Sequence, residues 1–388
     1  MRNVSPGRSG VPSRPAVDWR AVRAEFPALA RWIFLNTAEF GQLPRRSVEA
    51  AARHFARRDE TACADFLSWF DDADRLREAI ARLIHADRTD IAFVPNAASA
   101  LALLMTGIDW QPGDRIVTLR DEFPNNIYSP ALLANRGVGF IEASWEGFYE
   151  ALTERTRLVV LSEVGYMNGR RPPLAEISRR VHALGGLLYV DGTQSLGALE
   201  FDVRATEPDM FAVHGYKWLL APNGAAFMYV RPSLRKRIEP IVVGWRSHRN
   251  WRAVDNLHHG APEFVEAAER YEGGMLPFAV LYPMLASVEM IEQIGPERIE
   301  RRVLELADYA RASLRRLGAR LPGDEQPHFE SPIVAARFEE GDASAIAREL
   351  RTRGVLISAR HGFLRISTHF YNNEDDVDRL GSELRRLV

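Results

Sequence analysis

The fold is decided by one stretch in the second half of the chain, Asp209-Met-Phe-Ala-Val-His-Gly-Tyr-Lys217-Trp-Leu-Leu-Ala-Pro-Asn-Gly-Ala-Ala-Phe-Met-Tyr229. It predicts a short apolar strand, a polar knuckle that carries Lys217, a Pro-Asn-Gly turn and a second, largely apolar strand. A lysine held between two buried strands is costly unless its charge is removed or paired. Enzymes use such desolvated lysines to form imines with carbonyl compounds, but an ordinary turn lysine explains these few residues equally well.

Apolar runs of strand length alternate with helical patterns around this stretch. Strands are expected at 91–94, 115–119, 138–141, 158–161, 187–190, 210–213 and 226–230, and helices near 99–107, 125–136, 146–153 and 174–184. Runs this apolar are buried on both faces, and helical crossovers between them imply an α/β fold with a mostly parallel seven-stranded sheet flanked by helices. Ligands of such sheets bind at the carboxyl ends of the strands.

The remaining pattern divides the chain into four parts. Residues 1–15 predict a basic, disordered leader without the apolar core of a signal peptide, and 16–44 a segment that joins the small domain. A large domain spans 45–275, and a smaller α+β domain spans 276–388, with long helices near 280–293 and 296–317 and a last helix from Glu374. Within the large domain, helices at about 44–59 and 72–85 flank an aromatic-rich connection at 60–71. Its aromatic side chains either pack in the core or line a pocket or interface.

Composition excludes several classes of function. Of 388 residues, 46% are hydrophobic and 26% charged, as in ordinary globular proteins. The net charge of −2 provides no basic patch for nucleic acid. The single cysteine, Cys63, excludes a disulfide framework and a multi-cysteine metal site, and no metal is expected. No run of 18 apolar residues suggests a membrane span, so the cytoplasm is the simplest compartment.

Two other segments bring polar residues to the same edge of the expected sheet. Asp191 leaves the end of the strand 187–190, about one crossover before Lys217, so both side chains should reach one cleft. In the chemistry of pyridoxal phosphate (PLP) an aspartate keeps the pyridine nitrogen protonated, although Asp191 could instead cap a helix. Asn96-Ala-Ala-Ser-Ala100 lies between a strand and a helix, where small residues form either a phosphate cradle or a plain helix cap.

With these motifs, the chain resembles the class V aminotransferase family of fold-type I PLP-dependent enzymes, which includes cysteine desulfurases, isopenicillin N epimerases and kynureninases. The resemblance runs from Leu35-Asn-Thr-Ala38 to the end of the chain. It implies that Lys217 forms the imine with PLP and that Asp191 binds the pyridine nitrogen, both as catalytic residues. The other cofactor contacts that it implies are Gln194 on the phenolic oxygen, and His214, Tyr216 and the backbone of Ala97 and Ala98 on the phosphate.

The resemblance also assigns the surroundings of the cofactor. Phe123 stands where the family stacks a side chain on the PLP ring, unless it packs in the core. Trp245 would reach a cofactor site, its own or that of a partner subunit, or be an ordinary loop tryptophan. Arg365 would bind the substrate α-carboxylate, unless it is solvated or paired. Tyr166 and Asn168 are candidates for substrate contact.

Residues that differ from the family pattern reduce the number of reactions expected of this chain. Cysteine desulfurases carry a cysteine on the loop before the residue that matches Arg365, and Ile357-Ser-Ala-Arg-His-Gly-Phe363 contains none. Kynureninases carry histidine at the position of Gln194 and asparagine near Met275. We therefore expect a lyase acting at the β or γ carbon of an amino acid (C–S or C–C), with an aminotransferase or epimerase, or a non-catalytic relative, as alternatives. The resemblance implies a homodimer with shared active sites, in which the loop around Gly274 reaches the neighbour's phosphate.

Overall fold

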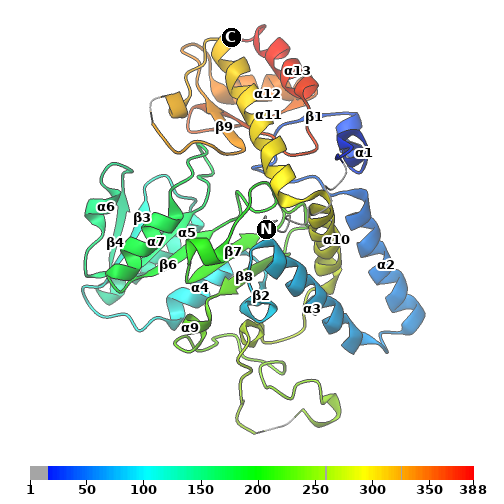
Figure 1. Ribbon diagram of the computed structural model, residues 1–388, viewed down its shortest axis with the longest axis vertical. Helices are drawn as coiled ribbons and strands as arrows, with labels where there is room; N and C mark the ends of the chain where they lie inside the picture. Colours follow the sequence, from blue (N-terminus) through cyan, green and yellow to red (C-terminus); the bar gives the residue numbers. More distant parts are fainter. Residues whose placement is uncertain (1–15, 258–259, 325) are drawn as a thin grey trace, which may run out of the picture.

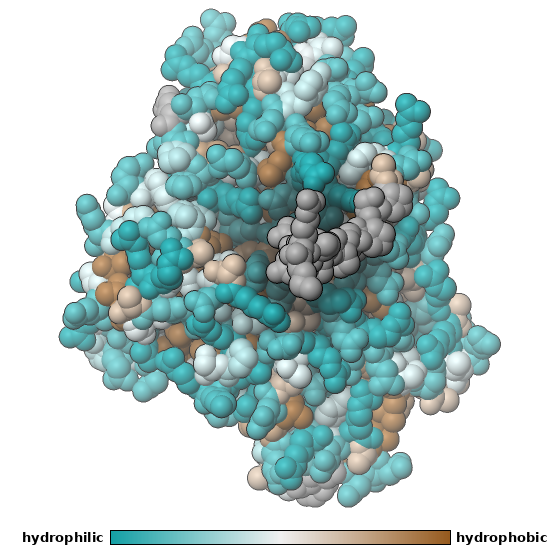
Figure 2. Space-filling model, in the orientation of Figure 1, coloured by the Kyte–Doolittle hydropathy of each residue, from teal (hydrophilic) through white to brown (hydrophobic). Residues whose placement is uncertain are grey.

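The computed structural model describes residues 16–257, 260–324 and 326–388, so the leader expected at 1–15 lies outside the described residues. The chain forms a large unit around a central sheet and a smaller unit, drawn above it in Figure 1. Figure 2 shows that this face is hollowed between the two units and that mostly hydrophilic side chains surround the hollow. In the described parts of the chain, no helix has the length and apolar character needed to cross a bilayer.

The central sheet has seven strands in the order β2-β8-β7-β6-β5-β3-β4. All neighbours pair in parallel from β7 to β4, whereas β8 is antiparallel to both β7 and β2. The prediction of a mostly parallel seven-stranded sheet is therefore confirmed. The strands are β2 Ile91–Val94, β3 Arg115–Leu119, β4 Gly139–Ala143, β5 Thr156–Ser162, β6 Leu187–Asp191, β7 Met210–His214 and β8 Ala226–Val230.

Both faces of this sheet are buried. In β7, Phe211 and Val213 belong to one hydrophobic cluster, and Met210 and Ala212 belong to another on the opposite face. Such alternation follows from the two-residue period of a strand. The helices of the large unit are α2 Arg45–Thr61, α3 Phe66–Leu83, α4 Ala97–Gly107, α5 Asn125–Ala131, α6 Phe148–Ala151, α7 Leu174–Ala183, α8 Val203–Thr206, α9 Pro232–Arg235 and α10 Phe278–Ile294. The helix expected at 125–136 continues beyond α5 as a 3₁₀ segment, Leu132–Arg136.

The stretch 209–229 folds as its sequence predicts. β7 and β8 pair antiparallel, with Met210 opposite Val230 and His214 opposite Ala226. Gly215 donates its backbone N–H to the carbonyl of Ala225 over 2.8 Å and closes the knuckle between them. Because so short a connection cannot cross over to a parallel position, β8 runs back along β7. Lys217 consequently stands at the carboxyl end of β7.

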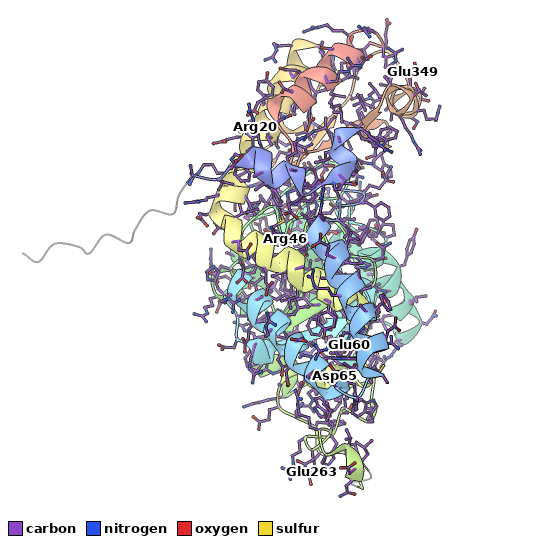
Figure 3. All side chains as sticks on the ribbon, turned by 90° about the vertical axis from the view of Figure 1, so that its right-hand side faces the viewer. Arg20, Arg46, Glu60, Asp65, Glu263 and Glu349 are labelled. Carbon is purple, nitrogen blue, oxygen red and sulfur yellow. The ribbon has the colours of Figure 1, made fainter. Side chains whose placement is uncertain are left out.

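One helix begins earlier than expected. α3 starts at Phe66, not near residue 72, and α2 ends at Thr61, so only residues 62–65 of the expected connection 60–71 lie outside a helix. Trp69 and Phe70 are buried and continue the apolar face formed by Ala73 and Leu76. The aromatic side chains thus pack inside the chain, and the turn at the α2–α3 junction lies between Glu60 and Asp65 (Figure 3).

The smaller unit combines a three-stranded sheet with three helices. Its sheet order is β11-β12-β9, from Ser358–Arg360, Phe363–Ser367 and Ile333–Ala336, and its helices are α11 Pro296–Arg316, α12 Ala343–Thr352 and α13 Glu374–Leu384. The N-terminal segment joins this unit, because β1 (Ile33–Phe34) pairs in parallel with β10 (Val355–Leu356). α10, which the sequence places in the small domain, packs against α2 and α3 instead, so the packing changes between the units at Gly295.

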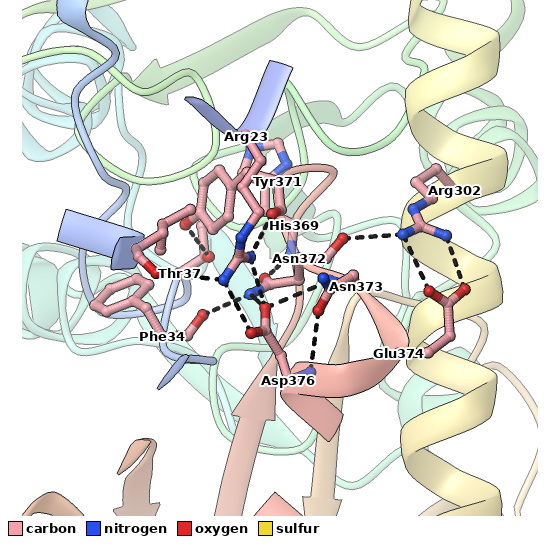
Figure 4. Close-up of polar contacts among 11 residues, drawn as sticks. Arg23, Phe34, Thr37, Arg302, His369, Tyr371, Asn372, Asn373, Glu374 and Asp376 are labelled. Atoms are coloured by element: carbon pink, nitrogen blue, oxygen red, sulfur yellow. Dashed lines mark hydrogen bonds and ion pairs between the residues drawn. The ribbon is translucent and has the colours of Figure 1, made fainter. Parts of the chain in front are cut away.

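An arginine fastens the N-terminal segment to α13 (Figure 4). Arg23, on α1 (Trp19–Ala24), donates to both carboxylate oxygens of the buried Asp376 over 2.8 and 3.0 Å and to the carbonyl of Tyr371 over 2.7 Å. Asn372 also donates to Asp376, over 2.8 Å. This network holds the N-terminal segment in place. That segment includes β1 and the residues that lead from it to Gly41, beside the knuckle.

Candidate active site

Lys217 is a buried amine at the centre of the site. Its side chain is only 6% exposed, and Nζ lies 5.5 Å from the ring centre of Phe123 and 5.4 Å from that of Tyr216. Burial, followed by the guanidinium charge of Arg365, lowers the pKa of Lys217 to about 7, and Asp191 offsets only part of this effect. Near neutral pH a large fraction of the amine is therefore unprotonated and nucleophilic.

The knuckle leaves no room for a side chain at Gly41. The backbone N–H of Gly41 donates to the carbonyl of Tyr216 over 2.9 Å. A Cβ atom at Gly41 would lie 1.8 Å from the carbonyl oxygen of Lys217. Only glycine allows the N-terminal segment to approach the lysine this closely.

Asp191 ends β6, directly beside β7. It is buried, and Oδ1 accepts a hydrogen bond from the backbone N–H of Thr193 over 2.8 Å. Burial raises the pKa of Asp191, against the opposing effects of the Thr193 hydrogen bonds and of the charge on Lys217. The carboxyl group is therefore poised to share a proton with a basic partner in the cavity.

A narrow cavity of about 30 Å³ joins these two side chains. Eight residues that the sequence singled out line it, together with three that it did not: Ala97, Phe123, Tyr166, Asp191, Gln194, His214, Tyr216 and Lys217, and Asn125, Ser162 and Thr193. The segments meet because the carboxyl ends of β2, β5, β6 and β7 lie at one edge of the sheet.

Gln194 and His214 are oriented by hydrogen bonds. Gln194 donates from Nε2 to the carbonyl of Ala38 over 3.0 Å and accepts at Oε1 from the indole of Trp218 over 3.0 Å. His214 accepts at Nε2 from the backbone N–H of Gly224 over 3.3 Å, so its other ring nitrogen carries the proton. Burial, then the Lys217 charge, lowers the pKa of His214 to about 4, which keeps the ring neutral.

The start of α4 supplies backbone donors at the cavity. Asn96 caps the helix by accepting the backbone N–H of Ser99 over 2.9 Å. The N–H groups of the first helical residues, Ala97 and Ala98, have no acceptor within the helix and favour an anion. Ala97 lines the cavity, whereas Ala98 is half-buried in the same turn and is not part of the lining.

Arg365 is almost completely buried on β12. Its Nε donates to Oγ of Ser358 over 3.0 Å, and Nη1 donates to the carbonyl of Tyr166 over 2.7 Å. Nη2 is buried without a hydrogen-bond partner among the described residues. Burial, then the neighbouring charge of Arg360, lowers the pKa of Arg365 to about 10. An unpaired buried guanidinium N–H is costly, and an incoming carboxylate would satisfy it.

Two expected residues lie elsewhere. Asn168 accepts the backbone N–H of Arg170 over 3.0 Å and faces neighbouring hollows, outside the lysine cavity. Trp245 packs against Phe70 and Trp251 of its own chain, with ring centres 6.0 and 5.6 Å apart. Neither packing was readable from the loop sequences, because it depends on segments far away in the chain.

Other residues at the site escaped the sequence analysis. Glu122 is buried and accepts from Oγ and from the backbone N–H of Ser162, each over 2.6 Å, and from Asn126 over 2.9 Å. Burial raises its pKa. The signal that could have indicated Glu122 is its position, directly before Phe123 and shortly after a buried strand. His361 contacts Tyr166, and nothing in the sequence around His361 indicates that contact.

The comparisons with known proteins agree with this geometry. The family model described as "Aminotransferase class-V" matches residues 67–380. The chain belongs to this family. Its members depend on PLP, so the protein is a PLP-dependent enzyme. The resemblance to the family is thus confirmed.

Three similar proteins illustrate the range of the family. A probable cysteine desulfurase of Methanothermobacter thermautotrophicus is 26% identical, with 95% of this chain and 97% of the relative covered. Isopenicillin N epimerase of Streptomyces clavuligerus is 28% identical, with 96% and 98% covered. The solved complex of the cystine C–S lyase C-DES with its product cysteine persulfide superposes with a TM-score of 0.84 at 23% identity, covering 93% and 99%. That likeness shows the fold.

Proposed function

We propose that this enzyme is a lyase that cleaves a bond at the β or γ carbon of an amino acid, first of all a C–S bond. The observation that carries the proposal is the buried Arg365, whose Nη2 has no hydrogen-bond partner among the described residues and which lies beside the cavity of a buried lysine of lowered pKa. This pairing suits an α-amino acid, because a carboxylate would bind the guanidinium while the amino group enters the cavity.

The residues present fit the cofactor. Lys217 would hold PLP covalently, Asp191 would bind the pyridine nitrogen and Gln194 the phenolic oxygen. His214, Tyr216 and the N–H groups of Ala97 and Ala98 would bind the phosphate, and the ring of Phe123 would cover the cofactor. When bound, PLP supplies an electron sink for the negative charge that develops at the substrate Cα.

The protein's own groups provide the remaining steps. Arg365 orients the substrate through its α-carboxylate, with Ser358 and the Tyr166 carbonyl holding the guanidinium in place. Lys217, freed as a neutral amine, removes the α-proton. The aromatic walls formed by Phe123, Tyr166 and Tyr216 limit the access of water.

The position of the cysteine supports lyase chemistry over persulfide transfer to the protein. Cys63 lies in the turn between α2 and α3 and does not line the lysine cavity. The hairpin before Arg365 carries His361 at its tip. In our proposal sulfur consequently leaves with the departing fragment of the substrate, as in the cystine C–S lyase named above.

Product analysis tests the proposal. Holoenzyme incubated with L-cystine and with S-substituted cysteines should release ammonia, a keto acid and a thiol or persulfide. Aminotransferase or epimerase activity remains the alternative, because an epimerase is among the relatives. Accumulation of pyridoxamine phosphate with intact side chains, or inversion at Cα without cleavage, would establish that alternative instead.

We also propose that the enzyme is a cytoplasmic homodimer. Ile241, Val242, Val243 and Met275 are each about half exposed on two adjoining loops. These loops belong to a region that projects from the large unit, with Glu263 at its tip (Figures 1 and 3). An apolar patch of this kind is typical of a subunit interface. Gly274 and Trp245 would then lie near the partner's site. Light scattering of the wild type and of Val243→Glu tests the dimer, since the charge should yield monomers.

A further inference from the structure

A tight hairpin brings a histidine to the mouth of the lysine cavity. β11 and β12 pair antiparallel, with Arg360 opposite Phe363, so His361 and Gly362 form a two-residue turn. Both have positive φ angles, 49° and 81°. Positive φ at both central residues is the type I′ geometry that matches the twist of a hairpin, and histidine tolerates it better than most side chains. The same hairpin carries Arg365 four residues later.

His361 makes a specific contact with Tyr166. Nε2 of His361 lies 3.1 Å from the hydroxyl of Tyr166, and the ring centres are 6.4 Å apart. Tyr166 lines the lysine cavity and packs edge-on against Phe123, at 5.2 Å. Its carbonyl is held by Nη1 of Arg365 over 2.7 Å. One hairpin thus fixes Tyr166 at its backbone and at its hydroxyl.

The surroundings of this pair suit proton transfer. Burial raises the pKa of Tyr166, so the hydroxyl keeps its proton until a strong acceptor meets it. The positive charges of Arg360 and Arg365 would stabilise a transient tyrosinate, whereas the negative charges of Asp121 and Glu122 oppose it. His361 is exposed and exchanges protons with water directly. The pair therefore connects the interior of the cavity to solvent.

We propose that Tyr166 and His361 form a proton relay that protonates the departing group of the substrate. The C–S bond breaks with both electrons on sulfur, while the electron pair left by the removed α-proton forms a double bond between Cα and Cβ. The Tyr166 O–H bond breaks, and its proton forms the new S–H bond. The tyrosinate takes a proton from Nε2 of protonated His361, and the imidazole regains one from water. The relay rests on the proposed lyase function and gives the enzyme a second acid, separate from Lys217, which acts at Cα.

A series of leaving groups tests the relay. Cleavage rates are measured for S-substituted cysteines whose thiol leaving groups span low to high pKa values. The rates of the wild type and of Tyr166→Phe are then compared for each substrate. General acid catalysis contributes about 10²–10⁴-fold, so Tyr166→Phe should lose roughly that factor with poor leaving groups and far less with good ones. An equal loss across the series would overturn the relay. If the wild type cleaves none of these substrates, the lyase function fails and the relay fails with it.

Rescue of activity by added imidazole distinguishes a role of His361 in proton supply from a structural role. His361→Gly suits the left-handed turn and opens space, so added imidazole should restore several-fold activity. His85→Gly is the matched control, because His85 is also exposed and left-handed, with φ 59°. It should neither lose activity nor respond to imidazole. A His361→Gly enzyme that imidazole does not rescue would contradict the relay.

A spectroscopic measurement tests the contact without turnover. In apoprotein labelled with ¹⁵N-histidine, Tyr166→Phe should shift the resonance that His361→Gly removes, because the hydroxyl contact disappears. The resonance that His85→Gly removes should not move. An unchanged His361 signal would show that the two side chains do not interact in solution and would overturn the proposal.

Discussion

The indole of Trp218, the residue after the lysine, donates from Nε1 to Oε1 of Gln194 over 3.0 Å. Because an indole N–H can only donate, this contact fixes which end of the Gln194 amide is oxygen. Nε2 then uses one N–H on the carbonyl of Ala38 and keeps a second at the cavity. The chain segment that carries the lysine thereby also aims a donor into the cavity.

Replacing Trp218 by phenylalanine should therefore weaken cofactor binding. The change leaves Oε1 of Gln194 without its buried partner, so the amide loses its fixed orientation. We expect the Kd for PLP to rise about tenfold, equivalent to ~1.4 kcal/mol. Titration of apoprotein with PLP, followed by absorbance, measures this.

Trp110→Phe is the matched control for that experiment. The indole of Trp110 is also buried and donates, to the carbonyl of Met105 over 2.7 Å, but it lies outside the cavity lining. Trp110→Phe should lower the stability of the protein without changing its affinity for PLP. Equal affinity losses in both variants would show that the Trp218 effect is merely structural.

The sequence was sufficient for the parts of the site that follow buried strands. Asp191 ends β6, Gln194 and Lys217 follow shortly after β6 and β7, and neighbouring parallel strands must end at one edge. The alternation of apolar runs and helices likewise predicted the seven strands of this mostly parallel sheet. The start of α3 was misplaced, and α10 was assigned to the small domain although it packs against α2 and α3 of the large unit.

The sequence was insufficient wherever a contact joins distant loops. Tyr166 and His361 are 195 positions apart, and no local pattern predicts their hydrogen bond. Asn168 was a reasonable candidate by position, but its amide is used by the turn to Arg170. Trp245 likewise packs on aromatic side chains of α3 and of its own loop. Such placements depend on tertiary packing, which residue type and spacing do not encode locally.

His369 should make the protein sensitive to acid. Its buried ring lies 2.9 Å from the carbonyl of Trp218, and burial lowers its pKa to about 3. In the unfolded state the His369 ring has a pKa near 6.5, so below that pH it binds a proton that it does not bind in the folded state. The contribution of His369 to stability is thus complete above about pH 6.5 and is lost as the pH falls toward 3. Urea unfolding at pH 7.5, 6 and 4.5 measures the slope.

His369→Asn should reduce this slope, although it lowers stability at pH 7.5 through the lost packing. Since other groups also titrate in this range, the comparison is between slopes. The exposed His85 provides the control, because His85→Asn should leave the slope at its wild-type value. A His369→Asn slope equal to that of wild type would mean that this ring is protonated in the folded protein.

Arg23→Ala should destabilise the protein far more than Arg302→Ala. The first change removes four hydrogen bonds, one of them to the carbonyl of Leu29, and leaves the carboxylate of Asp376, 2% exposed, with Asn372 as its remaining side-chain donor. We expect a loss of roughly 2–4 kcal/mol in the free energy of unfolding. Arg302 pairs with Glu374, whose side chain is 52% exposed, and should contribute at most about 1 kcal/mol from that ion pair (Figure 4). Urea unfolding of both variants gives the comparison, and equal losses would contradict the network's role.

The reactivity of Lys217 should depend on the charge of Arg365. Attachment of PLP to apoprotein requires the neutral amine, so its rate should rise with pH through about 7 and then level off. Arg365→Gln removes the second largest cause of the lowered pKa, and the inflection should move to higher pH. Arg365→Lys keeps a positive charge and should leave the inflection close to wild type, although both variants lose the guanidinium that would bind a substrate carboxylate. The measurement is the pH dependence of the attachment rate, followed by absorbance. An inflection that stays at the same pH in Arg365→Gln would assign the lowered pKa to burial alone.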